Sequence, residues 1–331
     1  MPLRAALIAS SVLVFASCAA KAPTVGASTC VLTPSEREWV AGTHVAWELV
    51  LRESLKARPV SRHPEVVLFN ETCQFTAVGD LPLRGSRHGG AVTLPDGQRV
   101  PPQVTSFSSP VPKTDLAFVA MALPSIWATA GVTSELGLTT LMTAVLVHEM
   151  THTLMFDAFN PRLAAVSARY GFGDDLSDDM VQETFEKDPA FVGAYRAERD
   201  LLYRAVTEPS ADEARRVAQM ALASITERRA RFYQGTEAKF AEVEDLWLTM
   251  EGAAQWAGYA WLVGRNGANR SAERALPLFR RGGRQWSQDE GLAIFLVVDR
   301  LLPGWHERVF TAAPATALDL LSLAVNRLSD R

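Results

Sequence analysis

The residues best suited to chemistry stand together in one short segment, His148-Glu149-Met150-Thr151-His152. Two histidines four positions apart lie one turn apart on the same face of a helix, so both imidazoles can approach one metal ion. The carboxylate of Glu149 lies beside them, where it can take a proton from a water that the metal activates. Zinc suits this set, because imidazole is a good zinc ligand and a catalytic zinc keeps one position for water.

The residues before this segment indicate that its helix is buried. No charged residue occurs from Leu136 to Val147, and a helix that is apolar on all sides packs inside a protein. Imidazole and carboxylate groups are costly to bury without a partner, and a metal ion supplies one. Two incidental histidines on a helix are the alternative. We expect this helix to be capped by Ser134 and to end at Pro161.

The segment resembles the H-E-x-x-H helix of the zincin metallopeptidases. The resemblance implies a zincin-like α+β fold, in which a small N-terminal mixed sheet precedes a predominantly helical part and the active-site helix lies at the junction. It also implies a Zn²⁺ ion held by His148, His152 and a third protein ligand, with Glu149 as the general base. A longer pattern with a third histidine is absent, since Met155 and Ala158 occupy its glycine and histidine positions.

The third ligand in gluzincins, one branch of this family, is a glutamate on a later helix. Glu251 fits this role best, because it lies mid-helix among apolar and small residues in a Glu-Gly-x-Ala stretch that resembles the third-ligand segment. We expect Gly252 and its small neighbours to let this helix approach the active-site helix closely. Gln255 stands where those enzymes place an aspartate that orients the first histidine. The other carboxylates considered are Asp157, Asp178, Asp179, Glu183, Glu186 and, as the nearest rival, Glu244.

Zincins often place a tyrosine or histidine opposite the metal to stabilise the developing oxyanion. Tyr259, Tyr203 and His306 are candidates for this role, and the sequence does not choose among them. The basic cluster that begins at Arg280 predicts a solvated helix end. Capture of a substrate carboxylate by this cluster is the alternative.

Residues 64–124 have the composition of strands and turns, and the remainder is predominantly helical. The segment 116–123 is the most apolar strand, and Pro-Asp-Gly at 95–97 predicts a tight turn. In zincins the strand nearest the active-site helix can pair with an extended peptide, so 116–123 or a neighbouring edge is the expected substrate platform. A buried core strand is the alternative. Before the sheet we expect a helix opened by Ser35.

The first residues indicate export from the cytoplasm. The apolar stretch 5–16 follows Arg4 and is too short to span a bilayer as a helix. Residues 1–17 are therefore interpreted as a lipoprotein-type signal peptide. The ending Phe15-Ala16-Ser17-Cys18 resembles a lipobox and predicts that Cys18 carries a lipid anchor. Ordinary signal-peptidase cleavage is the alternative, because Phe15 replaces the usual leucine.

Export places the mature chain in an oxidising part of the cell envelope, lipid-anchored to a membrane and facing the periplasm or the cell exterior. Only Cys30 and Cys73 remain there, and an even pair predicts a disulfide, with two buried thiols as the alternative. Residues 18–34 are interpreted as a tether. Residues 35–331 are interpreted as the metallopeptidase domain, an α/β lobe to about residue 160 and a helical lobe after it.

Composition limits the classes of function. A hydrophobic content of 48% and a charged content of 21% are globular values, and a net charge of −4 has no basic footprint for nucleic acid. The resemblance implies zinc-dependent hydrolysis of peptide bonds by a metal-activated water, with Glu149 as base and a peptide or protein as substrate. The alternative is a non-catalytic binding or scaffold lipoprotein of the cell envelope on the same fold.

Overall fold

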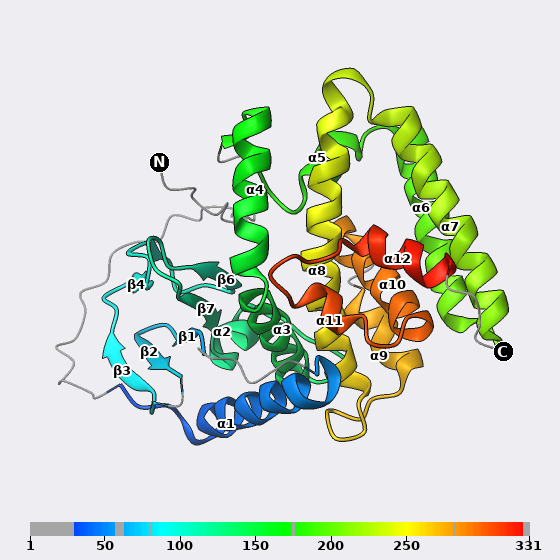
Figure 1. Cartoon of the computed structure of the whole chain (residues 1–331). Coiled ribbons are helices and arrows are strands. Elements are labelled where there is room, and N and C mark those ends of the chain that lie inside the picture. The colour runs from blue at the N-terminus through cyan, green and yellow to red at the C-terminus, as the bar shows by residue number, and fades with distance from the viewer. Residues whose placement is uncertain (1–29, 57–62, 80, 174–175, 281–282, 327–331) are drawn as a thin grey trace.

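The chain folds as an α+β protein, in which a small mixed sheet precedes a mostly helical part, as the sequence predicts (Figure 1). The predicted signal peptide, Cys18 and most of the predicted tether lie outside the residues that the structure describes. None of the described helices is both long and apolar enough to cross a membrane. The computed structural model describes residues 30–56, 63–79, 81–173, 176–280 and 283–326.

The N-terminal part contains a helix and a five-stranded sheet of order β3-β2-β1-β7-β6. Strands β1 and β7 run parallel, and the other neighbours in this sheet run antiparallel. Strands β4 and β5 form a separate hairpin around the predicted turn. The elements are α1 (Pro34–Leu49), a π-helical turn (Val50–Ser54), β1 (Glu65–Phe69), β2 (Cys73–Val78), β3 (Arg84–Arg87), β4 (Val92–Thr93), β5 (Arg99–Val100), β6 (Ser106–Pro110) and β7 (Ala117–Ala122).

The helical part is arranged around α3 and α8. Helix α3 lies between the sheet and α8, α10 packs against α8, and α6 and α7 form a hairpin beyond α10 (Figure 1). The helices are α2 (Pro124–Thr129), α3 (Leu138–Thr153), α4 (Phe156–Tyr170), α5 (Met180–Phe185), α6 (Pro189–Thr207), α7 (Ala211–Phe232), α8 (Phe240–Val263), α9 (Ala272–Phe279), α10 (Trp286–Leu301), α11 (His306–Val309) and α12 (Ala317–Asn326), with a 3-10 turn at Gly235–Lys239.

The N-cap of helix α1 is Thr33, two residues before the predicted cap Ser35. The Glu36 N–H donates to the Thr33 hydroxyl at 3.2 Å, and the Thr33 N–H donates to the Glu36 carboxylate at 2.9 Å. This reciprocal capping box satisfies two helix-end donors. Further along, the indole N–H of Trp39 donates to the Thr143 hydroxyl at 3.2 Å, so α1 braces α3 from outside.

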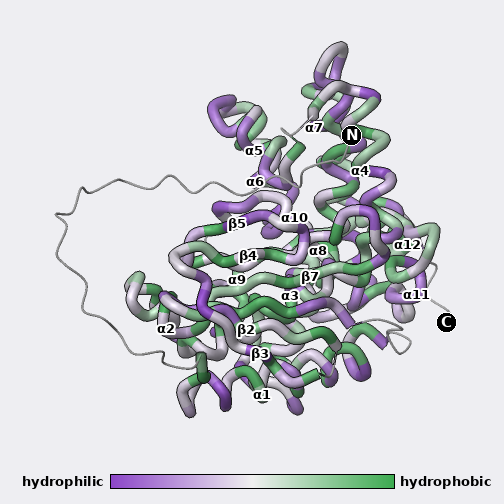
Figure 2. The backbone as a smooth tube through the Cα atoms, turned by 90° about the vertical axis from the view of Figure 1, so that its left-hand side faces the viewer, coloured by the Kyte–Doolittle hydropathy of each residue, from purple (hydrophilic) through white to green (hydrophobic). Residues whose placement is uncertain are grey.

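Strand β7 is an inner strand of the sheet, with β1 on one side and β6 on the other. Residues 118–122 are all buried, and burial of both faces explains the uninterrupted apolar run. In Figure 2, where the sheet faces the viewer, hydrophobic colour follows the central strands. Because β7 has no free edge, segment 116–123 cannot itself add a substrate strand. The neighbouring β6 is the edge strand on this side of the sheet.

Helix α3 starts later than the sequence predicts. The Ser134 hydroxyl accepts from the Leu136 N–H at 3.1 Å and so caps a turn that precedes the helix. The helix itself follows Gly137, whose φ of 90° is a conformation that glycine adopts at little cost. From residue 142 to 152 every residue is buried, as the absence of charge before His148 predicts.

The end of α3 also differs from the prediction. The Thr153 hydroxyl donates to the Met150 carbonyl at 2.7 Å, and the Leu154 N–H, which would otherwise use that carbonyl, turns back to Thr151 at 3.1 Å. This local competition for a carbonyl ends the helix at Thr153. Pro161 lies instead in the second turn of α4, where it removes a single backbone hydrogen bond.

Helix α8 approaches its two neighbours through two different glycines. A Cβ atom on Gly258 would lie 2.7 Å from the carbonyl oxygen of Ala144 on α3. A Cβ atom on Gly252 would lie 2.7 Å from the backbone of Gly291 on α10. The sequence assigned the close approach to α3 to the stretch that starts at Gly252. The structure assigns it to Gly258, six residues further along α8.

Gly258→Ala is therefore expected to lower the free energy of unfolding by about 1–3 kcal/mol, because the added methyl group meets a backbone oxygen that cannot rotate away. Urea unfolding measures the change. Gly193→Ala is the matched control, since Gly193 lies in the second turn of α6 and a Cβ atom added there would meet nothing within 4 Å. A gain of about 1 kcal/mol is expected there. A Gly258→Ala protein as stable as wild type would contradict the close packing of α3 and α8.

Cys30 and Cys73 form a disulfide with their Cα atoms 5.8 Å apart. It ties the segment before α1 to the first residue of β2. The same segment lies against the edge strand β3, since a Cβ on Gly85 would come within 2.5 Å of the Cys30 carbonyl oxygen. The disulfide closes a sequence separation of 43 residues and so restrains the unfolded chain.

Replacing both cysteines by serine is expected to lower the free energy of unfolding by about 4 kcal/mol, the chain-entropy value for a loop of this length. Urea unfolding of the double variant, with and without reductant for wild type, measures it. Peptides that contain Cys30 and Cys73 should also escape alkylation in the denatured, unreduced protein. Labelling of both residues under those conditions would rule the disulfide out.

Candidate metal centre

His148 and His152 occupy successive turns of α3 and turn their rings toward the same point. Their Nε2 atoms are 3.0 Å apart, and the two rings meet edge to face with centroids 4.6 Å apart. Both residues are buried, each 6% exposed. The four-residue spacing is the local reason for this convergence, since side chains at i and i+4 lie above one another on a helix.

Glu251 reaches the two imidazoles from α8, on the side of α3 away from the sheet. Its Oε2 lies 3.4 Å from His148 Nε2, and its Oε1 lies 3.3 Å from His152 Nε2. One ligand atom from each of the three buried residues falls within 4.8 Å of the others. The tertiary structure thus brings together the three side chains that the sequence nominated, from two separate helices, as a group able to hold a metal ion.

The distances within this cluster fit a tetrahedral metal site. Zinc bonds to nitrogen and oxygen of about 2.0–2.2 Å place neighbouring ligand atoms about 3.3–3.6 Å apart. The observed separations of 3.0, 3.3 and 3.4 Å are close to that spacing. Among the described residues, Glu251 Oε2 also finds no hydrogen-bond donor, although it is buried. A buried carboxylate oxygen without a donor is costly, and a metal ion would remove that cost.

The electrostatics of the cluster favour a positive charge between His148, His152 and Glu251. Burial alone would raise the pKa of Glu251, but the imidazoles of His152 and His148 hold that pKa well below its usual range. Burial would lower the pKa of His152, whereas the carboxylates of Glu251, Glu149 and Asp178 raise it. Several carboxylates therefore act on one imidazole, and a cation placed among them is stabilised.

Glu149 lies on the face of α3 that meets the edge of the sheet. The Ser106 hydroxyl donates to Glu149 Oε1 at 3.1 Å, and the Ser108 hydroxyl donates to Oε2 at 3.5 Å. Both serines belong to β6, a strand that the sequence analysis did not identify. Alternation along a strand would have placed the two hydroxyls on one face, but nothing local indicated which face meets α3.

Two of the rival carboxylates have other surroundings. Glu244 pairs with Arg228 at 3.0 Å and Arg229 at 2.7 Å and accepts the Tyr233 hydroxyl at 2.8 Å, so its charge is fully compensated. Glu183 is exposed on α5.

Asp178 lies close enough to the cluster for electrostatic coupling. Burial and the charge of Glu251 raise the pKa of Asp178 well above its usual range. Its side chain is nevertheless not one of the three that converge within ligand distance. Gln255, which stands where the resemblance has an orienting aspartate, donates to the Phe279 carbonyl at 3.0 Å. Among the described residues, Nδ1 of both histidines has no hydrogen-bond partner.

Two of the three candidates for oxyanion stabilisation make contacts of a structural kind. The Tyr203 hydroxyl donates to the Asp289 carboxylate at 2.8 Å, and His306 stacks on Trp305 with ring centroids 4.0 Å apart. Arg280 is the C-cap of α9, as the sequence predicts, but it is only partly solvated, because its guanidinium lies 2.8 Å from buried Asp289. A buried carboxylate on α10 thus fixes this arginine.

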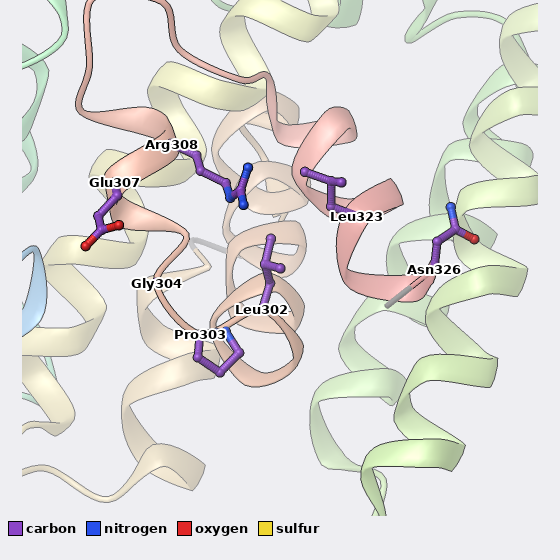
Figure 3. Close-up of a pocket in the computed structure, with 7 residues that line it drawn as sticks. All are labelled: Leu302, Pro303, Gly304, Glu307, Arg308, Leu323 and Asn326. Atoms are coloured by element: carbon purple, nitrogen blue, oxygen red, sulfur yellow. The ribbon is translucent and has the colours of Figure 1, made fainter. Parts of the chain in front are cut away.

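A surface pocket lies apart from the cluster, between the end of α10, α11 and α12 (Figure 3). Its polar lining residues are one arginine, one glutamate and one asparagine, and the others are apolar or glycine. None of the converging residues of α3 or α8 contributes to it. The lining residues are Leu302, Pro303, Gly304, Glu307, Arg308, Leu323 and Asn326.

No family model, curated protein or solved structure matches this chain. The fold and the site therefore define the class of protein by themselves. It is an α+β protein with a buried His-His-Glu cluster between two helices, one of which packs on the edge of the sheet. The cluster and the adjacent Glu149 are the observations on which a functional proposal must rest.

Glu251→Ala is expected to weaken zinc binding by more than about 100-fold, because loss of an outer partner of a metal ligand already costs 10–100-fold. Competition with a chromophoric chelator measures the affinity. Glu183→Ala is the matched control, since that glutamate is exposed. Glu244→Ala is unsuited to this comparison, because breaking its buried ion pairs would cost about 3–5 kcal/mol of stability.

Folded Glu251→Ala protein, verified by circular dichroism, that binds zinc as tightly as wild type would exclude Glu251 as a ligand. The assignment would then move to another carboxylate near the two histidines, with Asp178 the first to test.

Proposed function

We propose that this protein is a zinc-dependent peptidase of the zincin type, close to the gluzincin branch. The observation that supports the proposal is the convergence of His148, His152 and Glu251 with Glu149 one residue after the first histidine. A structural metal site requires the ligands alone. A buried carboxylate beside them, held by two hydroxyls, supplies what hydrolysis needs in addition, which is a general base.

The chemistry divides between the metal and the chain. A zinc ion held by His148, His152 and Glu251 would supply a Lewis acid that polarises a carbonyl and lowers the pKa of a water to about 7. Glu149 accepts a proton from the attacking water and passes it to the leaving amine. Tyr259, which is buried on α8 and has a pKa raised by burial, is the candidate that would hold the developing oxyanion.

The edge strand β6 is the proposed platform for the substrate. The Ala122 N–H donates to the Thr105 carbonyl at 2.9 Å, and the Val111 N–H donates to the Leu116 carbonyl at 2.8 Å. Hydrogen-bonded pairs alternate along an antiparallel ladder, so this register turns the main-chain groups of Ser106 and Ser108 to the open side of β6. An extended peptide added there would lie beside the cluster.

The non-catalytic alternative, a binding or scaffold lipoprotein of the cell envelope, makes a different demand on Glu149. A scaffold has no use for a base beside the ligands. In both proposals the predicted lipid on Cys18 would anchor the protein to a membrane. A measurement of turnover therefore distinguishes the peptidase from the scaffold, whereas the location of the protein does not.

Glu149→Gln is expected to keep zinc within a few-fold of the wild-type affinity and to lose at least about 100-fold in hydrolysis, because the amide is nearly isosteric but cannot accept the proton. Digestion of a peptide library, with metal analysis of the same sample and a chelated control, measures both. Full activity of Glu149→Gln would exclude the mechanism. Zinc-loaded wild type that cleaves no peptide in the library would favour the scaffold.

A further inference from the structure

Two serines of β6 each contact one oxygen of the same carboxylate. Ser106 Oγ lies 3.1 Å from Glu149 Oε1, and Ser108 Oγ lies 3.5 Å from Oε2. Residues two apart on a strand share a face and are about 6–7 Å apart along it. A carboxylate set between them therefore receives one hydroxyl from each side.

The two serines are the hydrogen-bond donors that the structure gives to the Glu149 side chain. Among the described residues, no lysine or arginine forms an ion pair with it. The group is 8% exposed, and a buried carboxylate without donors is costly. Each carboxylate oxygen can accept about two hydrogen bonds. One hydroxyl on each oxygen therefore leaves an acceptor site free for a reacting water.

The same two residues face the open edge of the sheet with their main chain. Their carbonyl and N–H groups point away from β7, whereas their hydroxyls point to α3. Strand β6 would therefore align both an added peptide and the Glu149 carboxylate. Ser109 differs, because its hydroxyl contacts the Pro110 carbonyl at 3.4 Å and its main chain pairs with β7.

We propose that Ser106 and Ser108 are positioning residues that hold the Glu149 carboxylate in one orientation between the metal ligands and the substrate strand. As a statement about catalysis this inference rests on the proposed function. As a statement about the orientation of Glu149 it stands on the two hydrogen bonds alone. A merely structural role of the hydroxyls, in which they only satisfy a buried carboxylate, would change stability and leave the turnover rate intact.

The test compares Ser106→Ala, Ser108→Ala and the double alanine variant with Ser109→Ala, which removes a hydroxyl from the same strand on its other face. The double variant should lose about 10–100-fold in kcat, because displacement of a catalytic group by about 1 Å can cost 100-fold. KM and zinc content should stay within about two-fold of wild type. Ser109→Ala should keep its kcat. The double threonine variant, which restores both hydroxyls, should recover most of the lost rate.

A crystal structure of the double alanine variant supplies a readout that does not depend on turnover. The Glu149 carboxylate should occupy one orientation in wild type and in Ser109→Ala, and more than one in the double variant. A single unchanged orientation in the double variant would overturn the proposal, as would an unchanged kcat in an active enzyme. If wild type hydrolyses no peptide, the proposed function fails, and the crystallographic comparison still decides whether the serines orient Glu149.

Discussion

The structure depends on the burial of polar groups in one helix that is otherwise apolar. Helix α3 lies between the sheet and α8, and His148, Glu149 and His152 are each less than a tenth exposed. In a low-dielectric interior such groups must find partners or shift their protonation. Each neighbour of α3 supplies some of them. The sheet provides two hydroxyls for Glu149, and α8 provides Glu251 for the imidazoles.

Helix α8 shows why Glu251, and not Glu244, belongs to the candidate metal centre. Glu244 lies two turns earlier on the same helix and is as deeply buried. It meets two guanidinium groups and a tyrosine hydroxyl, and charge-assisted hydrogen bonds of this kind compensate burial. Glu251 faces two imidazoles instead. The charge of Glu244 is therefore compensated by protein groups alone, whereas Glu251 would gain from an added cation.

The precision of this arrangement comes from close helix packing. Gly258 allows the backbone of α8 to meet α3, and Gly252 allows it to meet α10. Trp39 of α1 also holds α3, through its hydrogen bond to the Thr143 hydroxyl. A centre that joins two helices is only as well positioned as the helices themselves, and interiors packed to crystal-like density keep such positions fixed.

The sequence by itself determined the features that depend on a single element. The spacing of His148 and His152 required one helical face, and the apolar run before them required burial. Helical and strand periods are local properties, so they can be read from adjacent residues. The pairing of Cys30 with Cys73 followed from their number.

Only the tertiary structure decided which residues meet across elements. It brought Glu251, which the sequence already favoured over Glu244, to the two imidazoles, turned Ser106 and Ser108 but not Ser109 toward the base, and placed Gly258 rather than Gly252 against α3. The physical reason is common to these cases. Contacts between distant segments depend on how whole elements pack, and the energy of that packing is not contained in any local pattern.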